Sequence, residues 1–86
     1  MKRRRMRTMV TLKQIKISES EASAYYYPED STDPGFLVID LLTEEVKHID
    51  RAPGYEYGMS ASHARRELVR MAKAGDKRTE RVVMWY

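Results

Sequence analysis

The chain has 86 residues, 42% of them hydrophobic and 34% charged, and it contains no cysteine. A chain this short forms one domain and buries only about 60–65% of the surface that it exposes when unfolded, so a deep catalytic cleft is not expected. The absence of cysteine excludes disulfide bonds, cysteine-ligated zinc and thiol catalysis, and it favours a cytoplasmic protein over a secreted one.

Charge is distributed unevenly along the chain. Five of the sixteen Lys and Arg residues lie within residues 2–7, so the remainder, which has thirteen acidic residues, carries a net charge of −2 although the whole chain carries +3. Residues 18–60 hold ten acidic residues against Lys47 and Arg51, whereas residues 61–86 hold seven basic and three acidic residues. A basic, nucleic-acid-like character therefore belongs only to the N-terminus and to the C-terminal third.

The concentration of positive charge at the N-terminus divides the chain into two parts. Residues 1–8 are expected to be a flexible basic arm, and residues 9–86 a single α+β domain. The arm lacks the apolar stretch that follows the basic start of a signal peptide. The longest apolar run, residues 36–39, is too short to cross a membrane, so no membrane partner is expected.

Alternation of apolar and polar residues predicts four strands in succession. They are residues 10–18, 22–27, 36–41 and 45–49. In the first strand Val10 and Leu12 are out of phase with Ile15 and Ile17, which a β-bulge or a local twist would reconcile. Because the connections between these strands are short, an antiparallel meander is the simplest arrangement.

The second and third predicted strands place aromatic and apolar side chains on both faces of the sheet. Tyr25 and Tyr27 share one face of their strand, and Tyr26 lies on the other. Residues 36–41 are apolar on both faces, which is typical of a central strand. Two Pro- and Gly-containing loops, residues 28–35 and 50–58, follow the second and fourth strands.

Residues 60–74 are predicted to form the only helix, with Ser60 as its N-cap and Gly75 as its C-terminal stop. Its apolar side is mostly alanine, which allows close packing on a sheet. That side consists of Ala61, Ala64, Leu68, Met71 and Ala72. The opposite side carries a basic stripe without acidic residues, formed by His63, Arg66, Arg70 and Lys73.

A final strand is predicted at residues 82–86, so the order of elements is ββββαβ. The expected fold is α+β, with a mainly antiparallel four- to five-stranded sheet and one helix packed on one face. One helix leaves the second face uncovered, although residues 36–41 and 82–86 are apolar on both faces. The loop of residues 50–58, the curl of the sheet or another chain is expected to cover that face.

Four segments, YYYPED, PGFLVIDL, EYGMSASHAR and VVMWY, resemble those of short proteins of Gram-positive bacteria and their mobile elements. The resemblance covers residues 10–86 and excludes the basic arm. Such proteins form a domain family of unknown function, so the resemblance implies no activity and no site residues.

Two sets of residues are candidates for binding, although a solvated helix face and ordinary core packing explain the same patterns. Basic residues that would contact nucleic acid or an acidic partner are Lys2, Arg3, Arg4, Arg5, Arg7, His63, Arg66, Arg70 and Lys73. Aromatic residues that would form a protein interface are Tyr25, Tyr27, Tyr55, Tyr57 and Trp85. Aromatics on a sheet also stack with bases in some RNA-binding folds.

No constellation indicates catalysis or a cofactor. Glu44, Glu45 and His48 are of metal-ligand type, but alternation along a strand divides them between two faces. Ser60 and His63 lack a third orienting group. We therefore expect no enzyme, no small-molecule substrate and no cofactor. The expected function is a protein-interaction module, with a homodimer as one form of it, and the alternative is nucleic-acid binding through the arm and the basic stripe.

Overall fold

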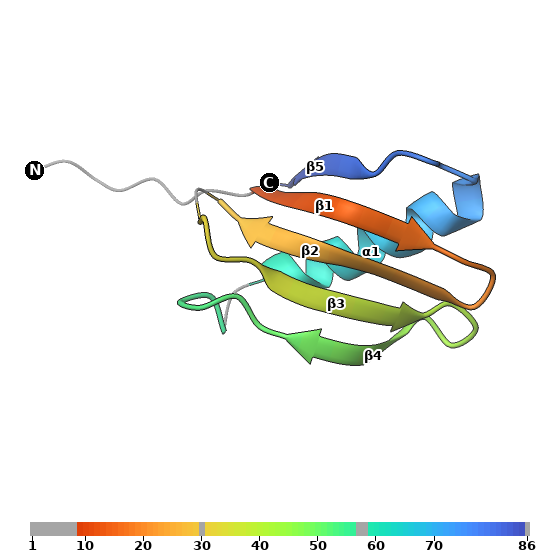
Figure 1. Ribbon diagram of the computed structural model, residues 1–86, viewed down its shortest axis with the longest axis horizontal. Coiled ribbons are helices and arrows are strands. Elements are labelled where there is room, and N and C mark those ends of the chain that lie inside the picture. Colours follow the sequence, from red (N-terminus) through yellow and green to blue (C-terminus); the bar gives the residue numbers. More distant parts are fainter. Residues whose placement is uncertain (1–8, 30, 57–58, 86) are drawn as a thin grey trace, which may run out of the picture.

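The computed structural model describes residues 9–29, 31–56 and 59–85, which form one antiparallel sheet and one helix (Figure 1). The elements are β1 (Met9–Ile17), β2 (Glu21–Pro28), β3 (Gly35–Asp40), β4 (Glu45–Asp50), α1 (Ser60–Ala74) and β5 (Glu80–Met84). The five strands lie in the order β4-β3-β2-β1-β5. The first four form the expected meander, and α1 then crosses the sheet so that β5 pairs with β1. The predicted α+β fold with its ββββαβ order is confirmed.

A β-bulge in β1 resolves the phase conflict of its sequence. The register between β1 and β2 shifts between Lys13 and Lys16, and Gln14 within the shift has a φ of 53°. The extra residue rotates the strand, so that Ile15 faces the same side as Val10 and Leu12 and is buried with them. Of the two alternatives that the sequence left open, a bulge and a local twist, the bulge is the one present.

The hydrophobic core lies between the sheet and α1, which packs mainly on β1, β2 and β3. Small residues on β2, Ala22 and Ala24, are fully buried and let the helix approach the sheet closely. From the helix, Leu68 and Met71 are fully buried, as their positions on its apolar side predict. The core thus occupies one face of the sheet, and every buried strand residue belongs to that face.

The sequence predicted the C-terminal end of α1 correctly and its N-cap incorrectly. Gly75 ends the helix as expected, with a φ of 69° and a backbone N–H that donates to Ala72 O at 3.3 Å. Ser60 is not the N-cap: the helix already begins there, and Met59 occupies the cap position without a side-chain hydrogen bond. The Ser60 prediction was wrong because this serine is buried in the first turn.

The last strand lies two residues earlier than predicted, at Glu80–Met84 instead of residues 82–86. It pairs only with β1, where Val83 lies opposite Val10 and Val82 opposite Thr11. Edge strands commonly carry charged side chains that point to solvent. Glu80 can therefore belong to this strand although it is not apolar. This explains why the polar start of the strand gave no strand signal.

Candidate interaction surface

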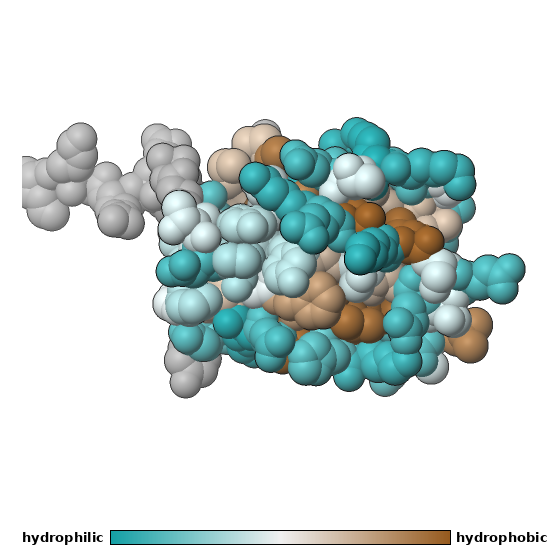
Figure 2. All heavy atoms as spheres, viewed as in Figure 1, coloured by the Kyte–Doolittle hydropathy of each residue, from teal (hydrophilic) through white to brown (hydrophobic). Residues whose placement is uncertain are grey.

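Within the described part of the chain, no segment covers the sheet face opposite α1, which we call the open face (Figures 1 and 2). Successive side chains of a strand point to opposite faces, so each strand contributes alternate residues to the open face. On β2 these are Ser23, Tyr25 and Tyr27, and on β3 they are Phe36 and Val38. The predicted separation of Tyr25 and Tyr27 from the buried Tyr26 is confirmed.

The open face has an apolar centre. Seven of its side chains are aromatic or aliphatic: Met9, Tyr25, Tyr27, Phe36, Val38, Val82 and Met84. Val82 and Met84 on β5 are 47% and 63% exposed. Figure 2 shows apolar and pale side chains across the middle of this face, with hydrophilic ones both among them and around the margin.

Aromatic side chains form a row across β2, β3 and β4 on this face. The rings of Tyr25 and Phe36, which are direct cross-strand neighbours, lie 4.8 Å apart between centroids and are tilted by 49°. The ring of His48 follows at 6.5 Å from that of Phe36. On the other side, Lys13 Nζ lies 5.3 Å from the centroid of the Tyr27 ring, within the range of a cation–π interaction.

Charged side chains of both signs lie among and around these apolar side chains, since Lys13 and Lys16 belong to β1, between β2 and β5. Lys47 on β4 reaches across β3 and donates a hydrogen bond to Glu21 on β2, which raises the pKa of Lys47. His48 Nε2 lies 3.2 Å from Asp50 Oδ2 on the same strand. Asp40, at the end of β3, accepts a backbone hydrogen bond from Leu42 at 2.8 Å and so fixes the turn into β4.

The structure divides the aromatic residues predicted to form an interface. Tyr25 and Tyr27 lie on the open face, whereas Tyr55 and Trp85 pack against the core on the side of the helix. Tyr57 lies outside the described residues. The loop of residues 50–58, one of the three alternatives for covering the second face, does not place Tyr55 there, because Ala52 is anchored in the core by a hydrogen bond from its N–H to Tyr26 Oη at 3.1 Å.

Trp85 stacks on the first turns of α1 rather than on the open face. Its ring lies 3.9 Å from that of His63, and the two planes differ by 8°. Burial under the indole lowers the pKa of His63, and the nearby Arg66 lowers it further. His63 is therefore a packing partner of Trp85 more than a cationic contact.

The rest of the basic stripe on α1 is largely neutralised by acidic residues. Arg70 Nη2 donates to Glu67 Oε2 at 2.6 Å and lies 3.6 Å from Asp76 Oδ2, while Lys73 Nζ lies 2.9 Å from Glu44 Oε2. Only Glu67 belongs to the helix itself; the other two acids are brought in by the fold. The expectation of an acid-free stripe therefore fails, although Arg66 is exposed.

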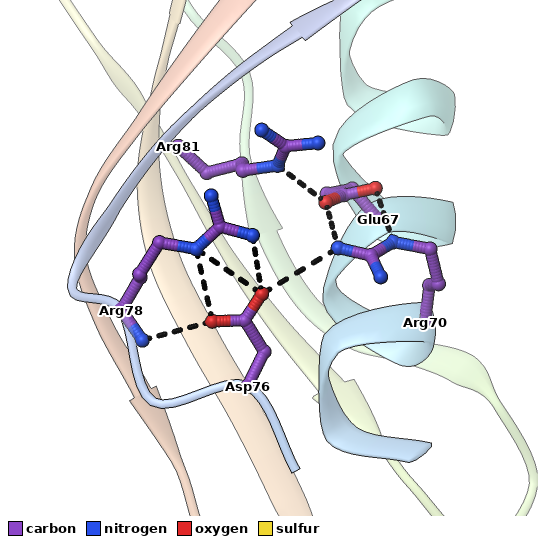
Figure 3. Close-up of polar contacts among 5 residues, drawn as sticks. All are labelled: Glu67, Arg70, Asp76, Arg78 and Arg81. Atoms are coloured by element: carbon purple, nitrogen blue, oxygen red, sulfur yellow. Dashed lines mark hydrogen bonds and ion pairs between the residues drawn. The ribbon is translucent and has the colours of Figure 1, made fainter. Parts of the chain in front are cut away.

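A network of five charged residues joins α1 to β5 through the intervening turn (Figure 3). Glu67 on the helix accepts from Arg70 and from Arg81 Nε on β5, the latter at 2.8 Å. Asp76 in the turn accepts from Arg78 Nη2 at 2.6 Å. These hydrogen bonds lower the pKa values of Glu67 and Asp76, so both carboxylates stay ionised at neutral pH. The network holds the helix against the edge strand.

Groups of metal-ligating side chains and surface depressions are the other places in the described residues where chemistry could occur. No group of three or more His, Asp or Glu side chains is arranged to hold a metal ion there. The depression of about 330 Å³ between β1 and the end of α1 is lined by Ile15, Ile17, Met71 and Asp76 among others. Its one carboxylate, that of Asp76, is already bonded to Arg78.

Sequence reasoning missed most of the open face. Phe36, Val38, Val82 and Met84 were not among the candidate residues, although their strands were recognised as apolar on both faces. The alternation in β3 carries the signal once the buried phase is known from Leu37 and Ile39. The arm candidates Lys2, Arg3, Arg4, Arg5 and Arg7 lie outside the described residues.

No helix in the described ranges combines the length and the apolar character needed to span a membrane. No protein-family model, no curated protein and no solved structure matches the chain.

Proposed function

We propose that this protein is a non-enzymatic interaction module that docks another protein on the open face of its sheet. The observation that carries the proposal is the unequal covering of the sheet. The helix buries one face, while the other holds seven apolar side chains, including the adjacent rings of Tyr25 and Phe36. Contiguous exposed apolar surface on a small soluble domain is typical of a docking site.

The composition of the open face favours a protein as the docked partner. Protein interfaces have an apolar, aromatic-rich centre and a polar rim, and Tyr side chains contribute much of their binding energy. The charges of the open face are acidic on balance. Lys13, Lys16 and Lys47 stand against Glu21, Asp40, Glu45, Asp50 and Glu80. Such a surface provides little attraction for a polyanion.

Single-stranded nucleic acid is the second candidate, supported by one contact. Lys13 lies over the ring of Tyr27, close to the Tyr25–Phe36 pair, and a base stacked on these rings would have its phosphate near a lysine. The basic arm precedes β1 directly in the sequence. In this form, bases would stack on the sheet and the arm would contact the backbone, while the neutralised helix stripe would contribute little.

Site-specific photo-cross-linking in the cells that express the protein tests both candidates. A benzophenone amino acid at position 25 places the probe at the centre of the open face, and the matched control at position 66 places it on the exposed side of α1. We expect protein adducts from position 25 and none from position 66. Adducts with nucleic acid from position 25 would favour the second candidate. Equal protein adducts from both positions, or none from either, would contradict the proposal.

A further inference from the structure

We infer that the protein docked on the open face presents an amphipathic α-helix, whose apolar side is bordered by acidic side chains along one flank and by basic side chains along the other. This inference rests on the proposed docking role of the open face and states which kind of partner surface fits it. Three properties of the open face support it: the shape of its apolar surface, the width of that surface, and the sign of the charges on its two sides.

The apolar side chains of the open face form a stripe that crosses the sheet obliquely. From one end to the other they are Val38, Phe36, Tyr25, Tyr27, Val82, Met9 and Met84. Val38 lies on β3, whereas Met84 lies on β5, with β2 and β1 between them. Cross-strand pairing places Met84 level with Met9 at one end of β1, and Val38 level with Lys16 near its other end. The stripe is therefore long and narrow, like the footprint of a rod.

The dimensions of the stripe match those of a helix. With strands about 4.8 Å apart and a rise of about 3.3 Å per residue, the stripe is about 25 Å long, which about 16 helical residues span. In its middle, one cross-strand row runs from Lys13 through Tyr25 and Phe36 to Asp50. The two charged ends of this row are about 14 Å apart, and a helix with its side chains is about 10–12 Å in diameter.

Other common partner surfaces fit the stripe less well. An extended peptide is about as wide as one strand, about 5 Å, and would leave half of the stripe exposed. A second sheet, whether from another protein or from another copy of this chain, would also cover the strands beside the stripe. It would then bury Lys13, Lys16 and Asp50 together with the apolar side chains, which is costly unless every charge is paired.

One long side of the stripe is basic. Lys13 and Lys16 are exposed on β1, and Lys13 Nζ lies 5.3 Å from the centroid of the Tyr27 ring, at the border of the stripe. Glu80, the cross-strand neighbour of Lys13 on β5, offsets part of this charge and leaves the side positive. Acidic side chains on one flank of a partner helix would pair with these ammonium groups while its apolar side covers Tyr27.

The other long side and the adjoining end of the stripe are acidic. The carboxylates there belong to Asp40, Glu45 and Asp50. His48 Nε2 lies 3.2 Å from Asp50 Oδ2, and Lys47 is already bonded to Glu21, so a negative charge remains on this side. Basic side chains on the second flank of a partner helix would pair with it. The partner that fits therefore has flanks of opposite charge.

Designed peptides test this recognition directly. Three synthetic peptides of about 16 residues share an apolar stripe of Leu at helical spacing. They differ in their flanks, which are one acidic and one basic, both basic, or both acidic. The peptide with opposite flanks should bind the full chain several-fold more tightly than either of the others, measured by titration calorimetry, and should become helical on binding, measured by circular dichroism. Equal affinity for the three peptides would overturn the inference.

Charge inversion on the protein tests which side of the stripe takes which flank. In the double variant Lys13→Glu/Lys16→Glu both sides are acidic, so the peptide with two basic flanks should now bind most tightly. Lys16→Glu alone should move the ranking in the same direction. Arg66→Glu on the exposed side of α1 is the control and should rank the peptides as the wild type does. A folded double variant that keeps the wild-type ranking would contradict the inferred contacts.

Photo-cross-linking in the cells that express the protein separates this inference from the proposed function. Benzophenone amino acids at positions 16 and 48, on the two sides of the stripe, should form adducts with one segment of about 16 residues in a single protein, acidic beside the first adduct and basic beside the second. Adducts with separate segments, or with a second copy of the chain, would overturn the helix and leave the docking role standing. The lack of any protein adduct from positions 16, 25 and 48 would contradict both.

Discussion

At the scale of single residues, the ring of Tyr26 occupies a closely packed site in the core. This side chain is 1% exposed, and its hydroxyl accepts a hydrogen bond from the buried Ala52 N–H at 3.1 Å. The ring packs directly on the backbone of Gly35, where an added Cβ would lie 2.4 Å from ring atoms and 2.6 Å from Asp50 O. Gly35 thus makes room for the ring that anchors the loop after β4.

Gly35→Ala should therefore be among the most damaging small substitutions in the domain. The methyl group has to displace either the Tyr26 ring or the backbone of β4, at a cost of about 3 kcal/mol or more in the free energy of unfolding. Gly54→Ala is the control: its φ of 84° is strained for alanine, but no atom lies within 4 Å, so about 1 kcal/mol is expected. Urea denaturation measures both, and equal losses would show that Gly35 is not closely packed.

The stacked pair of His63 and Trp85 gives a pH prediction with a built-in probe, since Trp85 is the only tryptophan. Burial lowers the pKa of His63 below its ordinary value of 6.5, with Arg66 adding to the effect. The folded state therefore binds the proton less readily than the unfolded state. As pH falls through 6.5 toward the folded-state pKa, stability should decrease, and below that pKa the loss should level off.

Trp85 fluorescence should report this titration, because a charged imidazolium in contact with indole quenches its emission. The midpoint should lie below pH 6.5, and His63→Gln should abolish the transition. A midpoint at or above 6.5 in the wild type would mean that the ring of His63 is not shielded by Trp85 in solution.

At the scale of elements, α1 depends on a few large side chains because the rest of its buried side is small. Leu68 is fully buried in the core. Leu68→Ala should cost about 2–4 kcal/mol, a large share of the stability of a domain of this size. Thermal denaturation measures the loss, with Arg66→Ala as an exposed control on the same helix. An unchanged melting temperature for Leu68→Ala would show that another side of the helix faces the sheet.

The ionic network gives the connection between α1 and β5 its own pH dependence. The hydrogen bond from Arg70, and then that from Arg81, lowers the pKa of Glu67 below its ordinary value of 4.5. A carboxyl with a depressed folded-state pKa contributes stability above its unfolded pKa, and this contribution is lost as pH falls through the folded-state pKa.

Glu67→Gln should therefore destabilise the protein at pH 7 by about 1 kcal/mol, since the site is only partly buried and solvent screens the charges. The difference from the wild type should shrink as pH is lowered below 4.5, because protonation of Glu67 removes the same interaction. Glu80→Gln on exposed β5 is the control and should have little effect. Denaturation curves at several pH values measure the difference in the free energy of unfolding between the wild type and Glu67→Gln. A difference that is the same at pH 7 and pH 3 would contradict the ionic role of Glu67.

The sequence allowed the elements to be predicted where local signals were unambiguous. The bulge followed from the phase change between Leu12 and Ile15, and the end of α1 followed from Gly75. The Ser60 cap and the start of β5 could not be predicted, because burial of the serine and the edge position of the strand depend on tertiary packing. Lys73 pairs with Glu44, 29 positions earlier in the chain, and no local pattern in the sequence reveals such a partner.

At the scale of the whole molecule, the domain has a sheet with two faces and a single helix to cover them. Sequence analysis identified this imbalance from residues 36–41, which are apolar on both faces, but it could not locate the exposed surface. Tyr55 and Trp85 looked like interface residues and instead complete the core beside α1. The register of β2 and β3 was needed to assemble Tyr25, Phe36 and Val38 into one surface.

The most direct test of the account compares the proteins that co-purify with the wild type, with Val38→Glu and with Arg66→Glu from the cells that express the chain. Val38 lies on the open face, and Arg66 lies on the exposed side of α1. We predict that Val38→Glu loses a partner that both the wild type and Arg66→Glu retain, while circular dichroism shows that all three are folded. Loss of the partner with Arg66→Glu, or its retention by Val38→Glu, would contradict docking through the open face.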